Sequence, residues 1–200
     1  MKYIKLFENF EQDDLTKEIE DYLGVDLETF GETQKVLALS PEGLQRWFDA
    51  EIDKDNPNLR VIAELERLGY NFDILKKDLF YAAENDKVGL ALYLLDKGAN
   101  MNAANIVQQT LLHYAASSDS IRVATLLLDR GYDMEVKDYR QLTALHIAAS
   151  SDSIRVATLL LDRGAYMEAR SEWQETPLHY AVKNRKIRVA NLLRSRGATE

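Results

Sequence analysis

Hydrophobic and polar residues recur along this chain in blocks that repeat every 33 residues. Glycines at positions 98, 131, 164 and 197 share this spacing, as do threonines at positions 110, 143 and 176. The segments 115–131 and 148–164 are identical, both reading AASSDSIRVATLLLDRG. Self-similarity at a fixed period of this length indicates stacked repeats, because one such unit cannot bury its apolar face alone.

Within one period, the pattern predicts two short helices joined by a turn. Thr143 is expected to cap the first helix, because its hydroxyl can accept a hydrogen bond from a free amide of the first turn. The SSDS stretch breaks that helix, and the spacing of apolar residues from Ile154 to Leu161 then predicts a second, amphipathic helix. Gly164 is expected to end it in a left-handed conformation. The polar residues before the next Thr predict an extended, hairpin-like loop.

These units resemble ankyrin repeats. The family pattern, roughly Thr-Pro-Leu-His followed by Ala-Ala, two Leu and Gly-Ala, is matched by TLLHYAASSD…LLLDRG, TALHIAASSD…LLLDRGA and TPLHYAVKNR…LLRSRGA. A further copy, KDLFYAAEND…YLLDKGA, begins at Lys77. The resemblance covers about residues 77–200. It implies an all-α solenoid of stacked helix-turn-helix units that are joined by hairpin-like loops.

Two glycines of the family pattern are replaced in this sequence. Gln stands where a Gly precedes the Thr by two residues, and Asp or Arg stands where a Gly separates the two helices. These departures leave the geometry of the hairpins and turns open. The residues concerned are Gln108, Gln141 and Gln174 in the hairpins, and Asp86, Asp119, Asp152 and Arg185 in the turns.

The repeat pattern divides most of the chain into units. Residues 77–109, 110–142 and 143–175 are predicted to be three ankyrin repeats, and 176–200 a C-terminal capping repeat. Residues 41–76 are predicted to be a degenerate capping repeat, with one helix opening at Pro41 and a second starting near Asn56 and Pro57. Arg194 stands where the preceding repeats have Leu128 and Leu161, as expected where no further repeat follows.

Residues 1–40 match no repeat. Apolar positions from Leu15 to Leu23 predict one amphipathic helix that ends at Gly24. The opening MKYIKLFENF is similar to the starts of many small proteins of large tailed phages. That similarity implies a protein that acts in a bacterial host.

The composition of the chain excludes several classes of site and of membrane protein. The chain has no cysteine, which excludes a disulfide framework, a Cys-ligated zinc site and a thiol nucleophile. No stretch approaches the roughly 18 unbroken apolar residues that span a bilayer. Charged residues interrupt the N-terminus, MKYIKLFENFEQDD, unlike a secretory signal. We therefore expect a cytoplasmic protein that has no contact with a membrane.

The net charge of −8 is unevenly distributed. Residues 1–60 carry 15 acidic and 7 basic side chains, whereas residues 176–200 carry 6 basic side chains and one acidic side chain. Such a basic cluster fits either a phosphate-binding patch or a solvated face on a terminal repeat. The overall acidity argues against nucleic acid, whose binding depends on neutralising phosphates.

The three histidines, His113, His146 and His179, occupy the same position in successive repeats. Stacked helices lie about 8–10 Å apart, so these histidines cannot share one metal ion at bond lengths of about 2.0 Å. In the ankyrin family this histidine hydrogen-bonds backbone groups, and the resemblance implies the same role here. The sequence has no nucleophile elbow and no Gly-rich phosphate loop. We expect no catalytic residue, no metal and no cofactor, and hence no enzyme.

The resemblance also implies where a partner would bind. Ankyrin arrays resemble a cupped hand in which hairpin tips are the fingers and first helices form the palm, and they generally bind other proteins on that side. The tips differ in every repeat, reading NIVQQ, DYRQL and SEWQE, and they contain the Tyr, Arg and Trp that dominate interface energetics. The expected contacts are Ile106, Val107, Gln109, Tyr139, Arg140, Leu142, Glu172, Trp173 and Glu175 in the fingers, and Ser117, Ser150 and Lys183 in the palm.

Several alternatives stay open at the level of sequence. Tyr139 and Trp173 fit either contact with a partner or packing on neighbouring hairpins. The leading hypothesis is a protein–protein interaction scaffold, with a phage or bacterial effector or inhibitor of a host protein as one form of it. A second hypothesis is a nucleic-acid or phosphate binder that uses the basic C-terminal repeat. A third makes residues 1–40 the active element. The sequence indicates neither the partner's identity nor the oligomeric state.

Overall fold

The computed structural model describes residues 39, 41–54, 57–69 and 78–199. Over these residues the structure is helical, and its β structure is one isolated bridge between Ala104 and Thr110. The chain divides into two compact units, one of Met1–Asp49 with Asn58–Asp73 and the other of Ala50–Pro57 with Ile74–Glu200. No helix in the described part of the chain combines the length and apolarity that crossing a membrane requires. The all-α repeat fold expected from the sequence is confirmed.

Helices α4 and α5 lie upstream of the repeats and are amphipathic. Helix α4 (Pro41–Ile52) buries Leu44, Phe48 and Ile52, which share one face at a spacing of four residues. Helix α5 (Leu59–Arg67) begins two residues later than predicted, since Asn58 is its N-cap. The Asn58 side chain accepts a hydrogen bond of 3.2 Å from the amide of Val61. The predicted helix over residues 15–24 lies outside the described residues.

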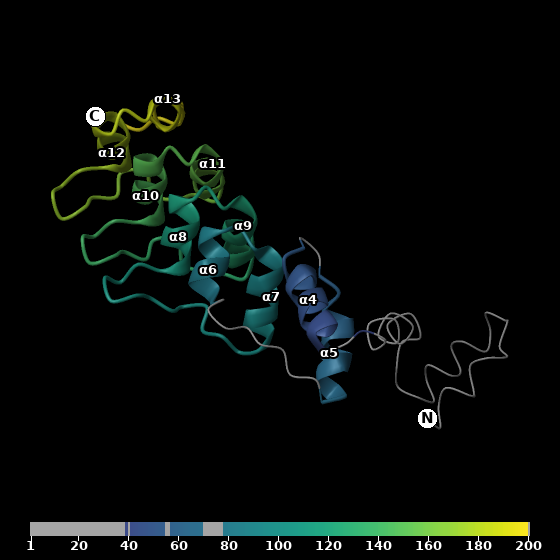
Figure 1. Cartoon of the computed structure of the whole chain (residues 1–200). Helices are drawn as coiled ribbons and strands as arrows, with labels where there is room; N and C mark the ends of the chain where they lie inside the picture. The colour runs from purple at the N-terminus through teal and green to yellow at the C-terminus, as the bar shows by residue number, and fades with distance from the viewer. Residues whose placement is uncertain (1–38, 40, 55–56, 70–77, 200) are drawn as a thin grey trace, which may run out of the picture. The chain divides into compact units, whose positions relative to one another are not determined.

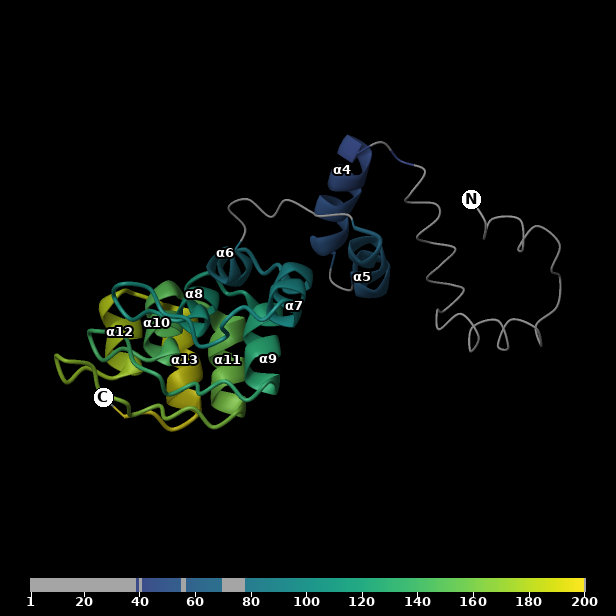
Figure 2. The ribbon, with the colours of Figure 1, turned by 90° about the horizontal axis from the view of Figure 1, so that it is seen from below.

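Four helix pairs follow, and they form two rows (Figures 1 and 2). The first helices of the pairs contact one another in sequence order, and so do the second helices. Hairpin loops project from one side of the array (Figure 1). The first row contains α6 (Leu79–Glu84), α8 (Leu111–Ser117), α10 (Ala144–Ser151) and α12 (Pro177–Lys183), and the second contains α7 (Val88–Asp96), α9 (Ile121–Asp129), α11 (Ile154–Asp162) and α13 (Ile187–Ser195).

Small residues allow the first helices to pack closely. Ala115, Ala116, Ala148 and Ala149 are completely buried, and larger apolar side chains fill the space between the two rows. Helices α9 and α11 each place their Val, their Ala and the second of three consecutive Leu residues in this core. Arg194 is exposed at the position of Leu128 and Leu161, which are half-buried. The core therefore runs continuously through the repeats.

The turns between helices keep the left-handed conformation although they lack glycine. Asp86, Asp119, Asp152 and Arg185 have φ between 53° and 62°, at the position where the family pattern has Gly. Non-glycine residues adopt this conformation at a cost of roughly 1–2 kcal/mol, and Asp tolerates it better than most. Gly164, at the end of the second helix, also has a positive φ of 87°, as predicted.

The turn aspartates offset this cost by accepting hydrogen bonds from the second helix of the next repeat. The carboxylate of Asp86 accepts hydrogen bonds from the amides of Arg122 and Val123 at 2.9 and 3.1 Å, and from Arg122 Nε at 2.9 Å. It therefore caps the N-terminus of α9 and pairs with the Arg on its first turn. We call this contact the Asp–Arg relay. It recurs as Asp119 with Arg155 and Val156, and as Asp152 with Arg188 and Val189.

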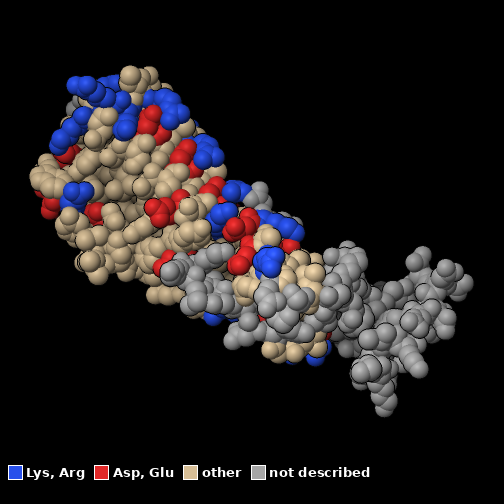
Figure 3. Space-filling view, viewed as in Figure 1, with Lys and Arg blue, Asp and Glu red and all other residues tan. Residues whose placement is uncertain are grey.

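A second series of ion pairs joins the C-terminal ends of the second helices. Asp129 pairs with Arg163 at 2.8 Å, and Asp162 pairs with Arg196 at 2.7 Å. Acidic and basic side chains accordingly alternate along the flank of the second helices in Figure 3. Exposed ion pairs of this kind contribute little individually, but a regular series favours one stacking register.

Candidate partner-binding surface

Each hairpin finger is a compact turn organised by one polar side chain at its base. In the second finger, Asp138 Oδ1 accepts hydrogen bonds from the amides of Arg140 and Leu142, both at 2.9 Å. The Asp138 amide donates to the Leu142 carbonyl at 2.9 Å, and Gln141 has a positive φ of 60°. Asn105 and Ser171 hold the other two fingers in the same way. The hairpin geometry is thus kept without the glycine of the family pattern.

Neighbouring fingers are joined by backbone hydrogen bonds near their tips. The Tyr139 amide donates to the Val107 carbonyl at 3.2 Å, and the Glu172 amide donates to the Arg140 carbonyl at 3.0 Å. These bonds are independent of side-chain identity. The side chains at the tips can therefore differ between fingers without changing how the fingers associate.

Arg140 packs against both tip aromatics. Its guanidinium carbon lies 5.7 Å from the centre of the Tyr139 ring and 5.5 Å from the centre of the Trp173 ring, within the distance at which cation–π attraction is significant. Tyr139 and Trp173 nevertheless keep 54% and 53% of their surface exposed. The two rings thus take part in packing between hairpins and also remain accessible to a partner.

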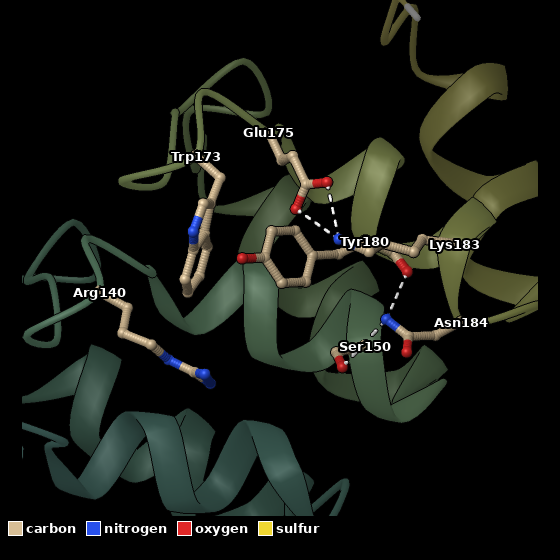
Figure 4. A pocket seen from close by; sticks show the side chains of 7 residues that line it. All are labelled: Arg140, Ser150, Trp173, Glu175, Tyr180, Lys183 and Asn184. Carbon is tan, nitrogen blue, oxygen red and sulfur yellow. Dashed lines mark hydrogen bonds and ion pairs between the residues drawn. The ribbon is translucent and has the colours of Figure 1, made fainter.

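A cavity of about 410 Å³ opens beside Trp173, between the fingers and the palm. Figure 4 shows Trp173 and Tyr180 facing each other across it, with the Arg140 guanidinium at one end. Lys183 pairs with Glu175 at 2.9 Å, and this hydrogen bond raises the pKa of Lys183. The cavity is lined by Arg140, Ser150, Trp173, Glu175, Tyr180, Lys183 and Asn184.

Most of the residues that the sequence predicts as partner contacts are exposed or half-buried in the fingers and palm, but one of them is buried. Leu142 is only 1% exposed and belongs to the core, because the hairpin turns its side chain under the finger. It is therefore a wrong choice for a partner contact. Ile106 is fully exposed. Exposed or half-buried positions are also taken by Val107, Gln109, Tyr139, Arg140, Glu172, Trp173 and Glu175 in the fingers, and by Ser117, Ser150 and Lys183 in the palm.

Tyr180 lines the cavity, although it is not among the contacts expected from the sequence. Its ring packs edge-on against the ring of His146, with centres 5.5 Å apart and planes at 90°. The available signal was its place directly after the His of the repeat motif, where Tyr114 and Ile147 stand in the preceding repeats. Tyr180 lies on the side of α12 that faces the cavity.

The histidines connect each first helix to the base of the next finger. The Thr143 amide donates to His146 Nδ1 at 3.1 Å, so that His146 Nε2 carries the proton and donates to the Glu175 carbonyl at 3.2 Å. His113 makes the same contacts with Thr110 and with the Leu142 carbonyl. The structural role implied by the family resemblance is confirmed for these two side chains.

Burial keeps these imidazoles neutral. It lowers the pKa of His146 to about 4, against the smaller opposing effect of the hydrogen bond to the Glu175 carbonyl. Burial likewise lowers the pKa of His113. Protonation would also place a hydrogen on Nδ1, where each histidine accepts a bond from a Thr amide. His146 and His113 are therefore fixed in a donor-and-acceptor arrangement that serves structure.

The described residues contain no group of three His, Asp or Glu side chains that could hold a metal ion. The basic C-terminal cluster is partly neutralised. Figure 3 shows Lys and Arg gathered over the end of the array that holds α12 and α13. At least three of the basic side chains there are in ion pairs, namely Lys183 with Glu175, Arg188 with Asp152 and Arg196 with Asp162.

Comparison with known proteins agrees with this architecture. No curated protein showed significant similarity to the chain. A family model described as ankyrin repeats, three copies, matches residues 56–138, 79–171 and 112–199. These overlapping matches together cover residues 56–199, well over half of the sequence, and ankyrin repeats are generally modules for protein–protein interaction. The chain belongs to the ankyrin-repeat family.

Proposed function

We propose that this protein is a non-catalytic scaffold that binds a protein partner across its fingers and palm. The observation that carries the proposal is the cluster of Tyr139, Arg140 and Trp173 on two adjacent fingers. These three residue types dominate the energetics of protein interfaces. Each ring keeps about half of its surface exposed although it already packs on Arg140, so a partner would bury the remaining half.

The cluster is also held in place before binding. The Glu172 amide joins its finger to the Arg140 carbonyl, and Asp138 fixes the turn that carries Tyr139 and Arg140. A surface that is ordered in the free protein loses little conformational entropy on association. This supports a stable interface instead of a transient encounter.

We also propose that the protein neither catalyses a reaction nor binds phosphate groups. The buried histidines are committed to backbone contacts, and the three ion pairs of the C-terminal cluster compete with phosphate for its cations. The N-terminal similarity to phage proteins makes a bacterial cytoplasmic protein the first class of partner to test, with the chain acting as an effector or inhibitor. Residues 1–40 would then dock elsewhere while the repeats hold the partner.

The proposal is tested by partner capture from bacterial lysate, using the full chain, the double variant Tyr139→Ala with Trp173→Ala, and Tyr166→Ala. Tyr166 is 63% exposed in the loop after α11, outside the fingertips, so it is a matched control for losing an exposed aromatic ring. We expect the captured protein to bind the double variant at least tenfold more weakly and the control unchanged. A partner that binds all three proteins equally would place the interface elsewhere.

Nucleic-acid binding is tested separately. A labelled oligonucleotide titrated with the full chain at low salt should show no association, since affinity for phosphates is strongest there. Binding that weakens steeply with added salt would instead favour the basic C-terminal repeat as the functional surface.

A further inference from the structure

Arg140 is a cation whose hydrogen-bond donors remain largely unused. Its Nε is buried and has no hydrogen-bond partner among the described residues. The rings of Tyr139 and Trp173 cover the guanidinium, and such stacking leaves the donors at the planar edge available. An unpaired buried donor costs roughly 1–3 kcal/mol. A group that accepts hydrogen bonds from this edge would therefore bind favourably.

Tyr180 presents a second unused group to the same cavity. Its hydroxyl oxygen is buried and, in the part of the chain that the structure describes, has no hydrogen-bond partner. Its ring is held edge-on against His146, which is itself fixed by Thr143 and the Glu175 carbonyl. Figure 4 shows the hydroxyl pointing across the cavity toward Trp173, on the side where Arg140 lies.

The charges around the cavity favour a single negative charge. Glu175 is neutralised by Lys183, whose Nζ lies 2.9 and 3.3 Å from its two carboxylate oxygens. Arg140 is then the one uncompensated charge among the lining residues. Asp138 does not line the cavity. Its Oδ1 is bound to backbone amides, and its Oδ2 is buried without a hydrogen-bond partner among the described residues. The positive charge of Arg140 opposes the entry of a cation, although aromatic rings alone would accept one.

We propose that this cavity receives the carboxylate side chain of an Asp or Glu from an extended segment of the protein partner, a proposal that rests on the proposed function. The Arg140 guanidinium and the Tyr180 hydroxyl donate to the carboxylate oxygens, and Trp173 covers the hydrocarbon part of the side chain. The cavity volume lies within the range of pockets that bind small-molecule ligands, roughly 300–1,000 Å³, so it has room for an acidic side chain. A phosphate dianion fits less well, because Arg140 is the one uncompensated charge among the lining residues and balances only one of its two charges.

The test selects random 12-residue peptides on the immobilised full chain and on three variants. Arg140→Gln removes the proposed donor, and Arg140→Lys keeps the charge but loses the planar edge. Arg163→Gln is the control, since it removes the same charge from the exposed pair with Asp129 on the second helices. Thermal unfolding confirms that each variant is folded. Arg140 makes no side-chain hydrogen bond that folding would lose among the described residues.

We expect peptides retained by the full chain and by Arg163→Gln to share one acidic position. That preference should be absent with Arg140→Gln and reduced with Arg140→Lys. In the tightest peptide, changing the acid to its amide should weaken binding to the full chain by tenfold or more and leave binding to Arg140→Gln unchanged.

Three results would overturn the carboxylate site. They are the absence of retained peptides, retained peptides without an acidic position, and an acidic position that persists with Arg140→Gln. Tighter binding of the same peptide with phosphoserine in place of the acid would replace it with a phosphopeptide site. In each case the capture experiment with Tyr139 and Trp173 still decides the proposed function separately, because it measures a whole partner protein.

Discussion

Two edges of the repeat array join successive repeats by different means. At the turns between helices, side chains make the connection, and the same Asp–Arg relay is used three times in succession. Near the fingertips, the hydrogen bonds between repeats are made by backbone atoms, through the amides of Tyr139 and Glu172. The turns are accordingly identical in two repeats, whereas every fingertip has a different sequence.

This difference explains how one array separates stability from recognition. A side-chain contact requires particular residues, so substitutions in the turns between helices weaken the contact between successive repeats. A backbone contact leaves side chains unconstrained, so the finger edge can present Ile106, Tyr139 or Trp173 to solvent at little cost to the fold. We therefore expect substitutions at the turns and at the finger bases to change stability, and substitutions at the tips to change binding.

The largest loss of stability is expected from His146→Ala. The imidazole is completely buried, and its removal leaves the Thr143 amide and the Glu175 carbonyl without their partner. We expect the free energy of unfolding to fall by about 3 kcal/mol, measured by urea denaturation followed by circular dichroism. His179→Ala is the matched control. Its Nε2 has no following hairpin carbonyl in the described chain, so the loss there should be nearer 1 kcal/mol. Equal losses would contradict the link between repeats.

Acidification should weaken the same link. The unfolded chain binds protons at these histidines below about pH 6.5, whereas His146 in the folded protein stays neutral until about pH 4. The stabilisation that the neutral, buried His146 gives the folded state is therefore fully present above pH 6.5. It is lost progressively as the pH falls toward 4, and the free energy of unfolding falls by up to about 3 kcal/mol. Urea denaturation at pH 7.5, 5.5 and 4.0 measures it. His146→Gln should flatten this dependence, and an unchanged slope would assign it to other groups.

Replacing the turn residues Arg185 and Asp119 by glycine should change the stability of the protein in opposite directions. Arg185→Gly removes a strained left-handed residue that binds no later repeat in the described chain, and we expect it to stabilise by about 0.5–1 kcal/mol. Asp119→Gly gains the same relief but loses the bonds to Arg155 and Val156. It should therefore destabilise by about 1 kcal/mol. Paired thermal unfolding midpoints decide the comparison, and stabilisation by both variants would show that the relay contributes nothing.

The smallest change in stability is expected at the fingertips. Tyr139→Ala and Trp173→Ala each remove a half-exposed ring and one contact with Arg140, while the backbone bonds between fingers remain. Each should lower the free energy of unfolding by no more than about 1 kcal/mol, measured under the conditions used for His146→Ala. A loss as large as that of His146→Ala would show that the rings serve the fold more than recognition.

Much of the fold could be predicted because the same helix and turn signals recur in each repeat of the sequence. Thr143 as N-cap, the break at SSDS and the positive φ of Gly164 all follow from local preferences. The start of α5 was misplaced because two Asn residues flank Pro57, and the bond between Asn58 and the Val61 amide becomes visible only in the folded chain. Leu142 was misassigned for a related reason, since its place in a variable fingertip said nothing of the direction in which the hairpin turns it.

By itself, the sequence determined the helix pairs and their number in the array, because a 33-residue period leaves stacking as the way to bury the apolar faces. The resemblance to ankyrin repeats implied the role of the histidines. Tertiary structure alone decided what the departures from the pattern mean. The turn aspartates cap helices one repeat away, 36 and 37 residues along the chain. The cavity likewise combines Arg140 from one finger, Trp173 from the next and Tyr180 from α12. Such contacts between repeats depend on how the units stack, which no single repeat specifies.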